Sequence, residues 1–186
     1  MDNPLVVVLV IALIVVIGVA AWLYMQKRRT EELRTSFGPE YDRAVRDHED
    51  KGKAERVLEE RKERVEQLHI RPLPHEDRER FAERWRSVQA QFVDDPKGAT
   101  LEADRLVGEV MQARGYPVGD FEQRAADVSV NHPRVVEHYR AAHTITLRHE
   151  RGEAETEDLR QAMVHYRALF EDLLEVETPA HREVRR

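Results

Sequence analysis

The chain has 186 residues, no cysteine, 41% apolar residues and 35% charged residues, whereas soluble domains have about 45–50% and 25%. The lack of cysteine excludes disulfides, thiolate zinc sites, iron–sulfur clusters and a thiol nucleophile. The formal charge of −6 argues against a general nucleic-acid binder, so we expect no nucleic-acid partner. At this length, we expect one soluble domain with a thin core of Val, Leu and Ala.

An uncharged apolar segment follows a short N-terminal tail at residues 1–4. Residues 5–25 carry the sequence LVVVLVIALIVVIGVAAWLYM, which as a helix is long enough to cross a hydrocarbon core of roughly 30 Å. In lipid the backbone amides must be bonded within the segment, so a lone span must be helical. We therefore expect a single transmembrane helix.

The residues that flank this helix predict its orientation. Aromatic rings favour the membrane interface, and basic residues stay on the cytoplasmic side. The basic side is the juxtamembrane segment 26–38, whereas Asp2 is the only charge before the span. This predicts an N-terminus outside the cell and residues 26–186 in the cytoplasm. The residues predicted to lie at the interface are Trp22, Tyr24, Lys27, Arg28 and Arg29.

Two other interpretations of residues 5–25 are less favoured. Gly18-Val19-Ala20 before Ala21 resembles the cleavage site of a secretory signal, but signal peptides carry positive charge before a shorter apolar stretch. A dimerisation helix has weak support, because Gly18 has no small residue four positions away in either direction. We therefore interpret the segment as a plain anchor.

A charged helical arm is expected over residues 39–70. Gly38-Pro39 predicts its start, because Pro suits the first helical position. Between Glu40 and Glu66, ten acidic and eight basic residues are typical of a solvated helix with pairs four residues apart. Either one helix of about 45 Å or two helices meeting near Gly52 would fit, and its packing on the bundle is left open. Its narrow seam consists of Tyr41, Val45, His48, Val57, Leu58, Val65 and Leu68.

A helical bundle is expected over residues 74–176, because the prolines of Arg71-Pro72-Leu73-Pro74 break the preceding helix. Its first helix has an apolar stripe at spacings of four, three and four, which indicates core: Phe81, Trp85, Val88 and Phe92. The second helix runs from Pro96 to about Arg114, capped by Asp95 and ended by Gly115. Its expected inward residues are Leu101, Leu106, Val107, Val110 and Met111.

Three further helices are predicted. Asp120 and Gln123 resemble a capping box for a short helix over 121–127. Asn131 is expected to cap the next helix, ending near Arg151, with a buried face of Val135, Val136, Tyr139, Ala142, His143 and Leu147. Thr156 is expected to cap the last helix, with Leu159, Met163, Tyr166, Phe170 and Leu173 inward. The expected fold is therefore all-α: a transmembrane helix, the charged arm, an antiparallel bundle and a disordered tail at 177–186.

The nine histidines invite a metal-site interpretation, but their spacing argues against it. Two imidazoles reach one metal from a helix when they are three or four residues apart, and no such pair exists among His132, His138, His143 and His149. Glu66-x-x-His69 is a lone di-iron-type motif, and that architecture needs a second copy and two further glutamates. We therefore expect no metal, and we interpret His143 as a buried or half-buried histidine.

Sequence motifs typical of catalytic sites are equally scarce. No serine lies in a Gly-x-Ser-x-Gly elbow, and no glycine-rich phosphate loop is present. Asp127, Asn131 and His132 form the one polar cluster that could line a pocket, and we favour a role as helix caps. We therefore expect no catalytic residue, no cofactor and no enzymatic activity.

Two segments carry a resemblance: SFGPEYDRAVRDH at 36–48 and GYPVGDFEQRAADVSVNHPRVVEHY at 115–139. They resemble a family of uncharacterised bacterial single-pass membrane-anchored helical proteins, over most of residues 36–175. The resemblance implies a bacterial inner (cell) membrane and supplies no activity or site residue. We expect a membrane-tethered interaction or scaffold module with a protein partner, and a homo-oligomer is left open. The alternatives are an envelope- or division-associated stalk protein and, third, an enzyme of unknown type.

Overall fold

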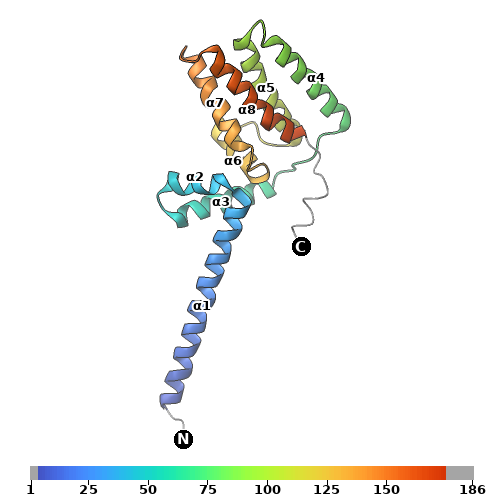
Figure 1. The fold of residues 1–186 in the computed structure, drawn as a ribbon. Helices are drawn as coiled ribbons and strands as arrows, with labels where there is room; N and C mark the ends of the chain where they lie inside the picture. Colours follow the sequence, from blue (N-terminus) through green and yellow to red (C-terminus); the bar gives the residue numbers. More distant parts are fainter. Residues whose placement is uncertain (1–3, 175–186) are drawn as a thin grey trace. The chain divides into compact units, whose positions relative to one another are not determined.

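The computed structural model describes residues 4–174, and helices are the only regular secondary structure over that range (Figure 1). The expected all-α class is therefore confirmed. The predictions for residues 1–3 and for the tail at 177–186 lie outside the described range. Two compact units, one ending at Leu58 and one beginning at Glu59, are described separately. The helices are α1 (Pro4–Phe37), α2 (Pro39–His48), α3 (Lys51–Glu66), α4 (His75–Gln91), α5 (Pro96–Arg114), α6 (Phe121–Asn131), α7 (Val136–Glu150) and α8 (Thr156–Leu174).

Helix α1 continues without a break through the segment predicted as juxtamembrane. Its stretch from Ile11 to Phe37 contains a window with a mean hydropathy of 1.5, none of which is buried. Val and Ile side chains here are highly exposed, for example Ile14 at 63%. Water solvates such a surface poorly, whereas lipid chains match it. The predicted apolar helix, long enough to cross a membrane, is therefore present.

The charged arm forms two helices, and the break lies three residues before the predicted point. Gly38 precedes α2 with a φ of 50°, and Pro39 is its first residue, as predicted. Glu49 ends α2 in the left-handed region with a φ of 54°. The Asp50 side chain then accepts a hydrogen bond from the Lys53 amide at 2.6 Å. Gly52 lies inside the first turn of α3 and is not the break, because Glu49 and Asp50 have already reversed the chain.

A buried carboxylate connects the three helices of the first unit. Glu55 Oε1 accepts hydrogen bonds from the Thr30 hydroxyl at 2.8 Å and from the Tyr41 hydroxyl at 2.9 Å. The ammonium of Lys51 lies 3.7 Å from the same oxygen. Burial, together with the hydrogen bond to Glu55, raises the pKa of Tyr41 to about 12. The predicted apolar seam is thus partly wrong, because a carboxylate lies within it and His48 is exposed.

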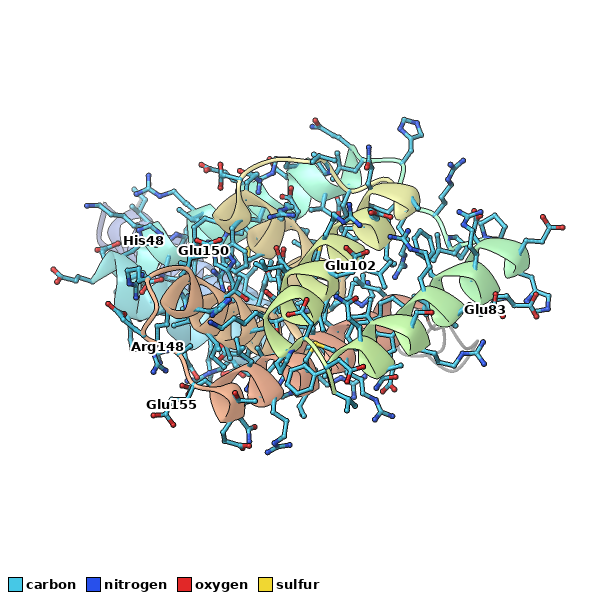
Figure 2. The ribbon with its side chains drawn as sticks, turned by 90° about the horizontal axis from the view of Figure 1, so that it is seen from above. His48, Glu83, Glu102, Arg148, Glu150 and Glu155 are labelled. Atoms are coloured by element: carbon cyan, nitrogen blue, oxygen red, sulfur yellow. The ribbon has the colours of Figure 1, made fainter. Side chains whose placement is uncertain are left out.

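The second unit is a bundle of α4, α5, α7 and α8, in which α8 packs against α5 and α7, and α4 packs against α5 (Figure 1). Charged side chains lie at its rim, as Glu83 and Glu155 illustrate (Figure 2). The predicted stripes of α4 and α8 do face the core, since Phe92 is partly buried and the other members are fully buried: Phe81, Trp85, Val88, Leu159, Met163, Tyr166, Phe170 and Leu173.

Two leucines predicted to point inward are exposed. Leu101, exposed by 44%, is nine residues before Val110 and therefore half a turn away at roughly 100° per residue. Leu147, exposed by 41%, lies in the last turn of α7. Thr146 takes the buried position beside it, and its hydroxyl is 3.0 Å from the Tyr166 hydroxyl.

Helix capping agrees with the prediction at three points and differs at one. Asp95 and Asp120 accept hydrogen bonds at 2.9 Å from the amides three residues later, and Gly115 ends α5 with a φ of 101°. Helix α6, however, extends to Asn131, past the predicted end at residue 127. Asn131 is therefore a helical residue and not the cap of α7, which begins after Val135 without a side-chain cap.

Candidate functional site

A network of polar side chains, centred on the buried Asp127 and the half-buried His132, lies in the second unit. Asp127, on α6, is fully buried, and its Oδ1 accepts hydrogen bonds from Arg64 Nε at 2.9 Å and Nη2 at 2.7 Å. Gln123 Nε2 donates a third at 2.9 Å. Asp127 Oδ2 is buried with no hydrogen-bond partner among the described residues. The predicted cap role of Asp127 is wrong, because the residue lies inside α6 and its carboxylate binds α3.

His132 occupies the centre of the other half of this network. Its Nδ1 contacts Oδ2 of Asp172 on α8, and its Nε2 lies 3.1 Å from Nη1 of Arg114 on α5. A guanidinium has no acceptor, so Nε2 must accept, and Nδ1 carries the proton that is donated to Asp172. The same Arg114 nitrogen donates to the Leu173 carbonyl at 3.1 Å. Both ring nitrogens of His132 are engaged, and neither is free to take a proton from a substrate.

The acid of this pair is held ionised. Burial disfavours the charged form of Asp172, but the hydrogen bond from His132 and the charges of Arg134 and Arg114 outweigh it. The pKa of Asp172 is therefore lowered from its ordinary value of 3.8. His132 is the C-cap residue of α6, in agreement with its predicted role as a cap, and its imidazole in addition joins α5 to α8.

Asn131 makes a separate contact in the same region. Its side-chain amide donates to the hydroxyl of Tyr116 at 3.1 Å. Burial raises the pKa of Tyr116, and the charges of Arg114, Asp127 and Asp172 all act on it. The structure therefore brings Asp127, Asn131 and His132 into one region, where Asp127 and His132 connect helices and Asn131 binds the loop after α5.

The strongest candidate for a recognition site is a groove between α4 and α8, with a cavity volume of about 560 Å³. Pockets that bind ligands typically measure roughly 300–1,000 Å³. Its apolar floor contains the rings of Trp85 and Phe170, which are stacked with centroids 4.7 Å apart. We call this feature the α4/α8 groove; its floor consists of Ala82, Trp85, Phe170 and Leu174, and its rim of Arg86, Gln89, Arg167 and Glu171.

The rim of the α4/α8 groove carries an excess of positive charge. Arg167 Nε pairs with Glu171 Oε1 at 2.7 Å, so these two charges balance each other. Among residues 4–174, Arg86 has only a long, exposed contact with Glu83, at 3.9 Å, and such contacts contribute little. A carboxylate on a bound molecule would therefore find a guanidinium at this rim. The spacing of apolar residues predicted the floor residues Trp85 and Phe170 as core. It did not predict the groove, because the polar rim residues are of the kinds found on any solvated helix face.

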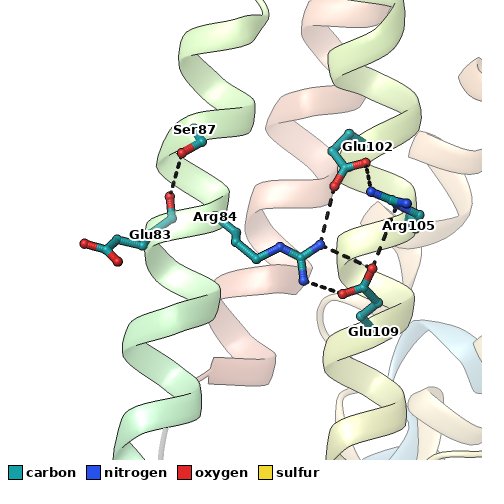
Figure 3. A network of polar contacts seen from close by, with 6 residues as sticks. All are labelled: Glu83, Arg84, Ser87, Glu102, Arg105 and Glu109. Carbon is teal, nitrogen blue, oxygen red and sulfur yellow. Dashed lines mark hydrogen bonds and ion pairs between the residues drawn. The ribbon is translucent and has the colours of Figure 1, made fainter.

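The neighbouring α4/α5 surface shows a contrasting arrangement (Figure 3). Arg84 Nη2 contacts Glu102 at 3.4 Å and Glu109 at 3.2 Å, and Arg105 Nε lies 3.8 Å from Glu109. The hydrogen bond from Arg84 lowers the pKa of Glu109 although burial opposes this shift. These charges neutralise one another across two packed helices. This surface is therefore better explained as a contact that stabilises the packing of α4 on α5 than as a binding site.

The described histidines form no metal centre with three or more protein ligands. Over residues 4–174, no group of three or more His, Asp or Glu side chains is placed to hold an ion. His143 is half-buried, as predicted, and stacks on Phe121 with centroids 3.5 Å apart; burial lowers its pKa. His138 meets His165 of α8, with 3.0 Å between their Nδ1 atoms. Sequence reasoning missed this pair, because it compared spacings within a single helix.

The predicted membrane-interface residues all lie on α1. Trp22 and Tyr24 are exposed at the end of the apolar run, and the basic residues follow directly along the same helix. The structure contains no bilayer, so their placement at an interface stays a prediction.

No family model, curated protein or solved structure matches this chain at a significant level. The chemistry of the surfaces described above therefore indicates where a partner could bind. Among these, the α4/α8 groove combines a recessed apolar floor with an incompletely paired charge.

Proposed function

We propose that this protein is a membrane-tethered interaction module that presents the α4/α8 groove to a partner protein at a bacterial cell membrane. The observation that carries the proposal is the apolar floor at Trp85 and Phe170, bordered by Arg86. Amphipathic helices bind such grooves by inserting apolar anchors, and a charged neighbour sets their orientation. The occupant we propose is an amphipathic helix with an apolar side chain for the floor and a carboxylate for Arg86.

The anchor in this proposal is α1. An exposed apolar helix is stabilised in lipid, because its backbone bonds are satisfied internally and its side chains match the acyl chains. The basic residues Lys27, Arg28 and Arg29 favour the cytoplasmic side. The orientation that follows is an N-terminus outside the cell and a cytoplasmic bundle, in the inner membrane that the family resemblance implies.

The proposal contains no catalytic step. The imidazole of His132 has both nitrogens engaged, one by the half-buried Asp172 and the other by Arg114. A general base needs a free acceptor within reach of its substrate. This arrangement supports a structural role for the polar network and favours a binding function over the enzyme alternative.

The stalk alternative has less support. A stalk of residues 39–70 would be favoured by one continuous helix, but Glu49 interrupts the arm in a left-handed conformation. The end of α3 is also held to the bundle, since Arg64 binds the buried Asp127 of α6. A homo-oligomer remains an alternative occupant of the α4/α8 groove, and the experiment below distinguishes it.

Site-specific photo-crosslinking in native membranes tests this function. A photoreactive residue at Gln89, on the groove rim, should crosslink to a helix of another protein that carries an acidic residue beside an apolar anchor. The Arg86→Glu variant should lose most of this product, and exchanging the partner's acid for Lys should restore it. Val93, exposed by 81% and outside the groove, is the control position. Crosslinks to a second copy of this chain, or to its own C-terminal residues, would contradict the proposed occupant.

A further inference from the structure

We propose that His138 and His165 form a two-imidazole site for a divalent transition-metal ion on the surface of the bundle. The two residues come from adjacent helices, α7 and α8. Their Nδ1 atoms are 3.0 Å apart, and the ring centroids are 5.2 Å apart with the planes inclined by 31°. This site is independent of the α4/α8 groove, since neither histidine lines the groove.

The two facing Nδ1 atoms hydrogen-bond to each other only when one of the rings carries its proton on Nδ1. Each neutral imidazole has one N–H and one lone pair. When both rings carry their proton on Nε2, two lone pairs oppose each other at the observed 3.0 Å. A metal ion binds imidazole nitrogen at about 2.0–2.1 Å, so two nitrogens coordinating one ion at a near-right angle lie roughly 3 Å apart. The observed separation therefore suits coordination by two neighbouring ligands.

The protonation state also suits coordination, because the neutral ring is the form that binds metal. Burial, together with repulsion from His138, lowers the pKa of His165 from its ordinary value of 6.5. This shift favours the neutral ring. Its half-buried position restricts the ring, whereas His138 is exposed and leaves a path for an ion from solvent.

The helices that carry the two histidines hold the pair in place. Helices α7 and α8 pack together, and beneath the surface the Tyr166 hydroxyl of α8 contacts Thr146 of α7 at 3.0 Å. A site on rigid, packed elements loses little freedom when an ion binds. Within the part of the chain that the structure describes, no third protein ligand joins the pair, so water would complete the coordination. Imidazole ligands favour Cu²⁺, Ni²⁺ and Zn²⁺, with Cu²⁺ bound most strongly.

The test is a titration of the full chain, without a purification tag, with Cu²⁺ in detergent micelles. Calorimetry should give one saturable site, and electron paramagnetic resonance should show two equivalent nitrogen ligands. His138→Gln and His165→Gln should each weaken binding by at least about tenfold, which is about 1.4 kcal/mol. The control is His48→Gln, an exposed histidine on α2, which should leave the affinity unchanged within about twofold.

Two results would overturn this site. Unchanged Cu²⁺ affinity in both pair variants would show that the ion binds elsewhere. An equal loss in His48→Gln would show that binding is spread over surface histidines. Circular dichroism of each metal-free variant should match the wild-type spectrum, because neither substitution removes a core residue; the comparison of affinities is then between equally folded proteins.

Discussion

The indole ring of Trp85 on α4 stacks on the phenyl ring of Phe170 on α8, with centroids 4.7 Å apart and planes inclined by 20°. Both rings belong to the hydrophobic core and also form the floor of the α4/α8 groove. Core stability and recognition therefore depend on the same two side chains. Substitutions that test recognition must leave these rings in place and change the rim or the space above the floor.

Trp85→Ala should destabilise the bundle by about 3–5 kcal/mol, because it deletes a large buried aromatic and its stacking partner cannot fill the space. Urea unfolding of the full chain in micelles, followed by circular dichroism at a helical wavelength, measures the change. Val93→Ala, at a position exposed by 81%, should stay within about 0.5 kcal/mol of wild type. Equal midpoints for both variants would mean that Trp85 contributes little to the core.

Arg64→Met should destabilise the second unit by about 1–3 kcal/mol, since it leaves the buried carboxylate of Asp127 without its main donors. Asp127→Leu removes that buried charge, so the double variant should recover much of the loss. Urea unfolding of both single variants and the double variant gives the coupling energy between the two sites. Additive losses would contradict a direct pair between α3 and α6.

The pH dependence of stability should report Asp172. Its pKa is lowered from 3.8 in the folded protein, so the folded state favours the ionised form. This contribution is fully present above the unfolded pKa and disappears as the pH falls through the folded pKa. Asp172→Asn should therefore reduce the free energy of unfolding at neutral pH, and its difference from wild type should shrink below pH 3.8. A difference that grows with acidity would reverse the sign and contradict the contact with His132.

The basic residues after the apolar run predict the side on which the bundle lies. A reporter fused after Arg186 should be active in the cytoplasm of a bacterial host, because Lys27, Arg28 and Arg29 resist translocation. Reporter activity in the periplasm would reverse the proposed orientation. A mature N-terminus at Ala21, determined by N-terminal sequencing, would show instead that the segment is a cleaved signal.

Local patterns predicted the elements of this fold well. The spacing of Phe81, Trp85 and Val88 indicates the buried face of α4. Asp95 and Asp120 each cap a helix by accepting a hydrogen bond from the amide three residues later. Such features depend on contacts within one or two helical turns, which a single sequence contains. The break of the arm was misplaced because Glu49, not a glycine, adopts the left-handed conformation.

Contacts between helices were not predicted, because helix packing determines them. Arg64 and Asp127 are 63 residues apart in the chain, and His138 and His165 are 27 apart. Spacing within one helix contains no information on either pair. The cap role predicted for Asp127 was wrong for the same reason. A polar residue near a helix junction can cap a helix or bind a residue that is distant in the chain, and here Asp127 binds the distant Arg64.

Blocking the α4/α8 groove while keeping its aromatic floor tests whether a partner helix docks there. Ala82 lines the groove, and Ala82→Arg places a long charged side chain over Trp85 and Phe170. The matched control, Val164→Arg, adds the same charge at an exposed position on α8 outside the groove. The account predicts that crosslinking from Gln89 to the partner helix falls at least about tenfold in Ala82→Arg, about 1.4 kcal/mol, and is retained in Val164→Arg. Equal crosslinking in the two variants, with both folded by circular dichroism, would contradict the groove as the docking site.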